Sequence, residues 1–189
     1  MARVVLPSAF SGTETVAIAR RLLGMRLVVR APGEDTTHAL RITETEAYDG
    51  PEDKACHASR GLTARTRVLF GPPGHWYVYL CYGIHEMLNL VTGPEGYPAA
   101  VLIRGVEGVV GPGRVTKALG IDRRFNALPA SRESGMWIED TGVVVPDAQV
   151  EIGPRVGVDY AGPIWAAKPW RFVHRPKLKP STRGARRGV

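Results

Sequence analysis

The sequence predicts a single α+β domain built mainly from antiparallel, curved β-sheet with a few helices. Its 189 residues suit one domain, and a hydrophobic content of 44% is enough to bury a core. Strand-like runs outnumber helical ones, and no internal repeat or long linker divides residues 1–175. Residues 176–189 are rich in Pro, Lys, Arg and Gly, and we expect them to form a basic tail with little order.

Two helices are predicted. The motif Ser11-Gly-Thr-Glu14 reads as a capping box, which predicts a helix with Val16, Ala19 and Leu23 on one stripe and Gly24 after its end. A second, short helix is predicted over residues 114–119, between two glycines.

The strands follow from alternating or continuous apolar runs. Residues 25–30 alternate and lead into a Pro32-Gly33 turn. Residues 99–103 are apolar throughout, which predicts a central strand buried on both faces. Tyr82-Gly83 separates two apolar runs, as in a tight hairpin. Further strands are predicted over residues 38–48, 76–82, 84–92, 99–106, 137–145 and 155–158.

The net charge of +7 resides near one end of the chain. Residues 171–189 contain seven basic residues and no acid, so the other 170 residues carry 18 basic and 18 acidic groups. A basic tail would attract phosphate in a salt-sensitive, sequence-independent way, but a solvated end without a binding role explains the charge equally well.

Cellular location is predicted from what the sequence contains. Cys56 and Cys81 are the two cysteines, and we expect both to be free thiols. No stretch approaches the roughly 18 apolar residues of a membrane span, and the apolar run after Arg3 is too short for a signal peptide. We therefore expect a soluble protein of the cytoplasm, associated with the nucleoid if the source is bacterial, without a membrane partner.

Two glutamates lie on one strand at the same parity. Strict alternation over residues 38–48 places Leu40, Ile42, Glu44, Glu46 and Tyr48 on one face. Burying an unpaired carboxylate is costly, so either this end of the strand meets water or an arginine, or one carboxylate lies on the floor of a pocket and activates a water. Parity does not choose between Glu44 and Glu46.

The segment W-Y-V-Y-L-C-Y-G, residues 76–83, concentrates tyrosines. Tyr77 and Tyr79 share one face, whereas Tyr82 has the opposite parity and lies at the hairpin tip. Aromatic residues are common in strands for packing reasons alone. Tyrosine also suits stacking on a base, and a ring that projects from a tight turn suits a wedge between base pairs.

Two basic groups of residues are candidate phosphate contacts. Arg60, Arg65 and Arg67 lie in the loop 49–74, and either a phosphate track or a solvated loop accounts for them. Arg114 and Lys117 lie on the predicted helix after Gly111-Pro-Gly113, whose N-terminus would face a phosphate.

The sequence predicts no metal and no cofactor. Five histidines and two cysteines lack paired zinc-ligand spacing, and no P-loop or dinucleotide fingerprint is present. An acidic set remains as a possible Mg²⁺ site of the nuclease kind: Glu44, Glu46, Asp49, Glu52 and Asp53.

Four motifs occur in series: R-I-T-E-T-E-A-Y-D-G-P-E-D-K-A-C-H, G-P-P-G-H-W-Y-V-Y-L-C-Y-G-I-H-E-M-L-N, A-V-L-I-R-G-V-E and G-P-G-R-V-T-K-A-L-G-I. In order and spacing, from about residue 6 to about residue 175, the chain resembles the 3-methyladenine (alkyladenine) DNA glycosylase family. The resemblance implies a hairpin that inserts into DNA and a monomer that acts on duplex DNA with damaged purines, of the 3-methyladenine, hypoxanthine and ethenoadenine class.

The resemblance also implies roles for single residues. Glu46 would be the general base for the attacking water, with Arg104 holding that water. Tyr48 and Tyr79 would sandwich the flipped base, and Tyr77 would lie nearby. The remaining assignments are His57 at the pocket edge, Asn89 on its floor against guanine, and Tyr82 as the wedge.

The implied reaction is hydrolysis of the glycosidic bond. A cationic alkylated purine leaves as a neutral base, so one carboxylate suffices, whereas most glycosidases use two. No lysine matches a family nucleophile, which predicts a monofunctional enzyme that leaves an abasic site.

Some positions depart from the pattern of the family and leave the lesion preference open: Ala64, Leu69, His85, Met87 and Arg114. Two alternatives remain, a non-catalytic domain that binds damaged DNA and a metal-dependent nuclease.

Overall fold

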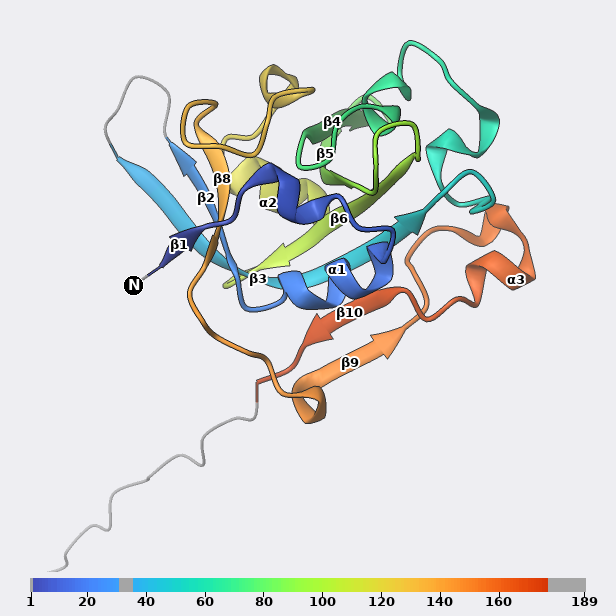
Figure 1. Ribbon diagram of the computed structural model, residues 1–189. Coiled ribbons are helices and arrows are strands. Elements are labelled where there is room, and N and C mark those ends of the chain that lie inside the picture. Colours follow the sequence, from blue (N-terminus) through green and yellow to red (C-terminus); the bar gives the residue numbers. More distant parts are fainter. Residues whose placement is uncertain (1, 31–35, 177–189) are drawn as a thin grey trace, which may run out of the picture.

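The computed structural model describes residues 2–30 and 36–176, and in this part of the chain ten strands form one curved antiparallel sheet (Figure 1). The strand order is β1-β8-β2-β3-β6-β5-β4, with β10 between β3 and β9 and with β7 beside β6. The strands are β1 (Arg3–Val4), β2 (Arg26–Arg30), β3 (Thr37–Asp49), β4 (Trp76–Cys81), β5 (His85–Thr92), β6 (Ala99–Val106), β7 (Val109–Val110), β8 (Met136–Asp140), β9 (Val150–Gly153) and β10 (Arg171–His174).

The helices are short. They are α1 (Thr15–Leu22), α2 (Pro112–Ala118) and α3 (Pro163–Ala166), with 3₁₀ turns η1 (Pro7–Phe10), η2 (His57–Arg60), η3 (Arg67–Phe70), η4 (Arg123–Phe125), η5 (Asp147–Gln149) and η6 (Asp159–Ala161). The predicted α+β class is confirmed, as are the strands β2 to β6 and the second helix, within a few residues at each end. Among the described residues, no helix is long and apolar enough to cross a membrane.

The predicted capping box is wrong. Ser11 ends the turn η1, where its hydroxyl donates to the carbonyl of Ser8 (2.9 Å). Helix α1 begins later, with Glu14 as an N-cap whose side chain makes no capping bond. The buried stripe of the helix consequently runs through Thr15, Ile18, Ala19 and Leu22, while Val16 is only partly buried.

Two strand predictions in the second half of the chain are also wrong. The strand predicted over residues 137–145 ends at Asp140, and residues 155–158 form a loop. The alternation of Val156 and Val158 is misleading, because this loop is anchored by the buried side chain of Arg155. Strands β9 and β10, which the sequence analysis did not predict, pair with each other, and β10 also pairs with β3.

Strand β3 is the spine of the sheet and contains a bulge at Glu44. Its first half pairs with β2, and its second half lies between β6 and β10. The register against β6 shifts on both sides of Glu44, where Gly105 faces the strand; a Cβ on Gly105 would lie 2.9 Å from the Cβ of Glu44. Because of this bulge, Ile42 packs in the same core cluster as Ala47, and the predicted shared face of Leu40 and Ile42 with the glutamates is wrong.

Beyond the bulge, the sheet β3-β6-β5-β4 has two distinct faces. One face packs against α1 and α2 in the main core, where Thr45 donates to the carbonyl of Ala19 (2.8 Å). On the other face, register pairing puts four residues of four adjacent strands in one row: Glu46, Leu102, Asn89 and Tyr77. Residues from three of the four sequence motifs therefore meet on one face.

Two predictions concern residues partly or wholly outside the described part of the chain. The Pro32-Gly33 turn and residues 177–189 of the basic tail lie there. Two of the seven basic residues near this end are described, and both form ion pairs: Arg171 with Glu44 (2.6 Å) and Arg175 with Glu151 (2.9 Å). These two cations are used within the fold.

Candidate active site

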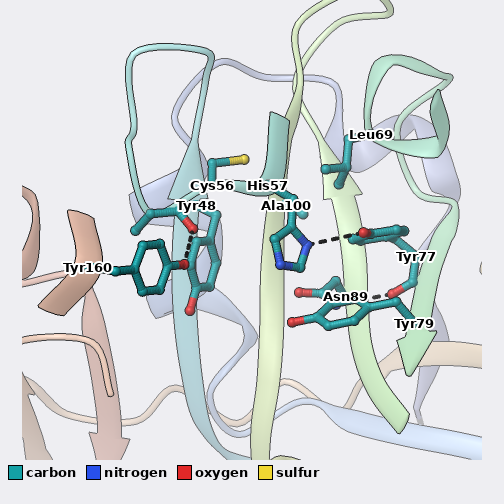
Figure 2. A pocket seen from close by; sticks show the side chains of 10 residues that line it. Tyr48, Cys56, His57, Leu69, Tyr77, Tyr79, Asn89, Ala100 and Tyr160 are labelled. Carbon is teal, nitrogen blue, oxygen red and sulfur yellow. Dashed lines mark hydrogen bonds between the residues drawn. The ribbon is translucent and has the colours of Figure 1, made fainter. Parts of the chain in front are cut away.

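A pocket of about 50 Å³ opens on the face of the sheet that carries the row described above (Figure 2). In Figure 2, Tyr48 stands on one side of the pocket, with His57, Tyr77 and Tyr79 on the other. The complete lining is Tyr48, Ala55, Cys56, His57, Leu69, Tyr77, Tyr79, Asn89, Ala100 and Tyr160. Five residues predicted for a base pocket are thus brought together.

Glu46 lies behind this pocket and is fully buried. Its Oε1 accepts from the backbone N–H of Val156 (2.7 Å) and lies 3.3 Å from Nε of Arg104, while its Oε2 accepts from the hydroxyl of Tyr48 (2.9 Å). A carboxylate has about four acceptor positions, so these three contacts leave capacity for one further donor, such as a water.

The environment of Glu46 affects its pKa. Burial raises the pKa above its ordinary value of 4.5, against the opposing effects of Arg104, the Val156 N–H and the Tyr48 hydroxyl; Glu44 adds to the rise. Burial makes a carboxylate more basic, which favours proton abstraction, provided that the pH still keeps it ionised.

Glu44 is also buried, but its partners are different. Its Oε1 accepts from Nε of Arg104 (3.1 Å) and from Nε of Arg171 (2.6 Å). Both glutamates stay buried and have an arginine partner, since Arg104 bridges the two carboxylates. Glu44 is held by two cations, whereas Glu46 has one cation, a backbone N–H and the hydroxyl of Tyr48.

The aromatic wall consists of His57, Tyr77 and Tyr79. The His57 ring meets Tyr79 edge-on at 4.6 Å between centroids, and its Nδ1 bonds the Tyr77 hydroxyl (3.1 Å). Burial, followed by the charges of Arg65 and Arg60, lowers the pKa of His57 to about 4. Burial also raises the pKa of Tyr77 and Tyr79. At neutral pH this wall is uncharged.

Asn89 and Cys56 form the remaining polar lining. Asn89 is buried, and its Nδ2 donates to the carbonyl of Tyr77 (3.1 Å), which fixes the amide between two strands. Burial raises the pKa of Cys56 to about 12, so this thiol stays protonated at neutral pH. Both described cysteines are free.

Tyr82 lies away from the pocket at the tip of the β4–β5 hairpin. Its side chain is 93% exposed, and both central residues of the turn, Tyr82 (φ 50) and Gly83 (φ 72), have positive φ. Such values are typical of a type I′ turn and are unfavourable for tyrosine. Ile84, beside it, is also exposed. The hairpin prediction is confirmed, and its tip presents two apolar side chains to solvent.

The predicted phosphate contacts do not all lie together. Arg60 and Arg65 line a groove of about 540 Å³ that also contains Tyr82 and shares His57 and Tyr79 with the pocket. Arg65 stacks over Tyr79 (4.8 Å). Arg67 lines a separate cavity with His75, and Arg114 and Lys117 are exposed on α2. The groove beside the pocket therefore contains two of the five.

The C-terminal quarter supplies site residues that the sequence analysis missed. Tyr160 lines the pocket and donates to the carbonyl of Ala55 (3.0 Å). Arg155, Val156 and Arg171 contact Tyr48, Glu46 and Glu44 respectively. These contacts depend on residues about 105 to 127 positions further along the chain, which no local pattern relates to the pocket.

Three of the five acidic residues considered for Mg²⁺ form ion pairs with arginines. Glu44 and Glu46 face Arg104, and Asp53 forms an ion pair with Arg155. Within residues 2–30 and 36–176, no group of three or more His, Cys, Asp or Glu side chains is arranged to hold a metal ion.

Comparison with known proteins agrees with this geometry. The family model for methylpurine-DNA glycosylase matches residues 9–110 and 107–177. A protein of Methanocella arvoryzae, provisionally named a 3-methyladenine DNA glycosylase, is 45% identical over 191 residues, covering 90% of this chain and 92% of that protein.

Two further relatives have similar coverage. An Anaeromyxobacter dehalogenans protein with the same provisional name is 48% identical over 177 residues, covering 90% of this chain and 83% of its own. The DNA-3-methyladenine glycosylase of Arabidopsis thaliana is 40% identical over 189 residues, covering 89% of this chain and 71% of its own. The chain belongs to the methylpurine-DNA glycosylase family.

Proposed function

We propose that this protein is a monofunctional DNA glycosylase that removes alkylated or deaminated purines from duplex DNA. The observation that carries the proposal is the placement of Glu46: a buried carboxylate beside Arg104, behind an uncharged pocket lined by tyrosines. Family membership supports the same class of activity.

The proposed reaction begins with extrusion of the damaged nucleotide into the pocket. Tyr48 stacks on one face of the base, and Tyr79 with His57 contacts the other. Stacking on tyrosine faces favours electron-poor and cationic rings, as in an N-alkylated purine. Tyr82 fills the place that the base has left in the duplex.

Bond cleavage then needs one positioned water. In the proposal, this water donates to Glu46 and is held by Arg104, and it attacks C1′ as the glycosidic bond breaks. The proton goes to Glu46, and the bonding electron pair leaves with the base, so that a cationic purine departs neutral. The product is an abasic site with an intact strand.

The electrostatics of the pocket bear on neutral lesions such as hypoxanthine. Such a base leaves more readily when protonated, but His57, with a pKa of about 4, is a neutral imidazole at pH 7 and not an acid that can protonate the base. The tyrosines are weak acids because burial raises the pKa of Tyr48, Tyr77 and Tyr79. Cationic lesions are accordingly the substrates that this pocket suits best.

A single-turnover assay tests the proposal. Duplexes carrying 3-methyladenine, ethenoadenine or hypoxanthine are incubated in EDTA with wild type, Glu46→Gln and Glu44→Gln, and strands are analysed before and after alkali. Base release by wild type with strands intact until alkali supports a metal-free monofunctional glycosylase. Glu44→Gln is the matched control, because it removes the other buried carboxylate of the same strand.

The outcomes separate the alternatives. Glu46→Gln should lose at least about 100-fold in rate, in line with general-base contributions, and Glu44→Gln should lose less. Tight binding without base release by wild type would instead identify a damage-binding module. Strand cleavage that EDTA abolishes would identify a nuclease.

A further inference from the structure

An ion pair between Asp53 and Arg155 lies next to the pocket but outside its lining. Both side chains are fully buried, and the contact is bidentate, with Nη1 to Oδ2 at 2.5 Å and Nη2 to Oδ1 at 2.9 Å. Asp53 also accepts from the backbone N–H groups of Asp49 and Ala55 (3.1 Å each). Apolar residues of similar size often stabilise a fold as well as a buried charge pair does, so stability alone is a weak explanation for this pair.

Arg155 and the residue after it hold three consecutive residues of β3. The Val156 N–H donates to Glu46, Nη1 of Arg155 donates to the carbonyl of Ala47 (2.9 Å), and the guanidinium lies over the ring of Tyr48 (4.8 Å). One dipeptide thus positions both the proposed base and a proposed stacking ring.

The guanidinium covers one face of the Tyr48 ring with its side chain fully buried, and Arg155 is not among the residues that line the pocket. It also lies over Trp170 (5.0 Å) and donates to the carbonyl of Trp165 (3.2 Å), both in the C-terminal segment. Tyr48 packs against two clusters, one together with Trp165 and the other together with Tyr77 and Tyr79. Tyr48 therefore separates the buried cation from any base that occupies the pocket.

We propose that Asp53, by neutralising Arg155 behind Tyr48, allows the pocket to accept cationic purines and so sets the preference for cationic over neutral lesions. This inference rests on the proposed function. A base stacked on the open face of Tyr48 would lie roughly 8 Å from the guanidinium. At an effective dielectric constant of about 20, an uncompensated cation at that distance weakens binding of a second cation on the order of 10- to 30-fold and leaves a neutral base little affected.

Three variants test the inference by changing the charge behind Tyr48 in different directions. Asp53→Asn leaves the cation alone, Arg155→Met leaves the carboxylate alone, and Asp53→Asn with Arg155→Met removes both. Asp147→Asn is the control, because it breaks an ion pair with Arg20 in which Asp147 is exposed. The quantity measured at pH 8 is the single-turnover kmax/K1/2 on 3-methyladenine divided by that on ethenoadenine.

The three variants are expected to change this ratio in different directions. Asp53→Asn should lower the ratio roughly 10- to 30-fold, Arg155→Met should raise it, and the double variant should return near the wild-type ratio although both rates fall. If the variants only disturbed the positions of Glu46 and Tyr48, kmax/K1/2 would fall by the same factor on both lesions and every ratio would stay unchanged. The inference is overturned if Asp53→Asn leaves the ratio unchanged. It is also overturned if the double variant lowers the ratio as much as Asp53→Asn does.

Breaking a buried ion pair is strongly destabilising, so Asp53→Asn is measured below its unfolding temperature. If that variant does not fold, Arg155→Met decides: a raised ratio supports the inference and an unchanged ratio overturns it. The proposed function fails separately, when wild type releases neither lesion.

Discussion

Glu46 and Tyr82 lie in opposite environments. Glu46 is 0% exposed and is held by three neighbours, whereas Tyr82 is 93% exposed at the tip of a two-residue turn. Each is unfavourable for the fold in its own way, because one is a buried carboxylate and the other a tyrosine with positive φ. In the proposed function the two residues have separable tasks, chemistry at the end of β3 and duplex distortion at the hairpin.

The largest expected effect separates binding from chemistry. Glu46→Gln should bind lesion-containing duplex as wild type does, while excision falls at least about 100-fold, because the amide cannot take a proton from water. Fluorescence anisotropy gives the Kd, and single-turnover quench gives the rate. A parallel loss of binding would show that Glu46 acts before the chemical step.

Tyr82→Ser should impair extrusion of the base and leave the chemical step intact. Without the ring, the vacated stack is unfilled, and excision from a paired duplex should fall about 10-fold, since unstacking one step costs a few kcal/mol. Excision of the same lesion from an unpaired, single-nucleotide bulge should change much less. If excision fell equally on the paired and the bulged substrate, Tyr82 would not act specifically on extrusion of a paired base.

Removal of residues 177–189 should have a smaller, salt-dependent effect. This segment lies outside the described residues, and the prediction comes from its five basic side chains. Affinity for undamaged duplex should fall, and the slope of log K against log salt should become shallower. A truncated protein with an unchanged slope would exclude the tail from DNA binding.

Tyr82→Gly should stabilise the fold by up to about 1 kcal/mol, because glycine adopts positive φ without the penalty of a side chain. Ala127 also has positive φ (65), so Ala127→Gly is the matched control for backbone relief. Urea unfolding gives the stability of both. We expect both variants to gain stability and only Tyr82→Gly to lose excision.

The smallest effect is the pH dependence of stability at Glu46. Burial raises the pKa of Glu46 in the folded state, so its ionisation is unfavourable to folding. Below the unfolded pKa, wild type and Glu46→Gln are both uncharged at this position; above the folded pKa, only wild type carries the buried charge. The Tm of Glu46→Gln minus that of wild type should therefore increase as the pH rises from 4 to 8. A difference that decreases over this range would contradict the raised pKa.

Sequence patterns predicted the parts of the fold where side-chain periodicity follows burial. Strand β6 matches residues 99–106 because it is buried on both faces, and the β4–β5 hairpin follows from Tyr82-Gly83 between apolar runs. Alternation failed at Glu44, because a bulge changes which residues share a face and Gly105, its cause on the facing strand, carries no pattern.

The pocket could be predicted only with the help of family resemblance. That resemblance named seven residues for the pocket and the proposed chemistry, and these lie in the pocket or directly behind it. The residues that support them were not predictable from pattern. Arg155 lies in a loop that reads as a strand, and its partner Asp53 is about a hundred residues away, so only the folded chain brings them together.

The late position of these supports has a consequence for biosynthesis. Val156 follows Glu46 by 110 residues, and Arg171 follows Glu44 by 127. During translation, the two glutamates and Arg104 emerge long before Val156 and Arg171, so the nascent sheet buries these carboxylates with an incomplete set of partners. Folding of the active site should therefore be delayed until β10 has left the ribosome, and a chain stalled before that point should be inactive and a substrate for proteolysis.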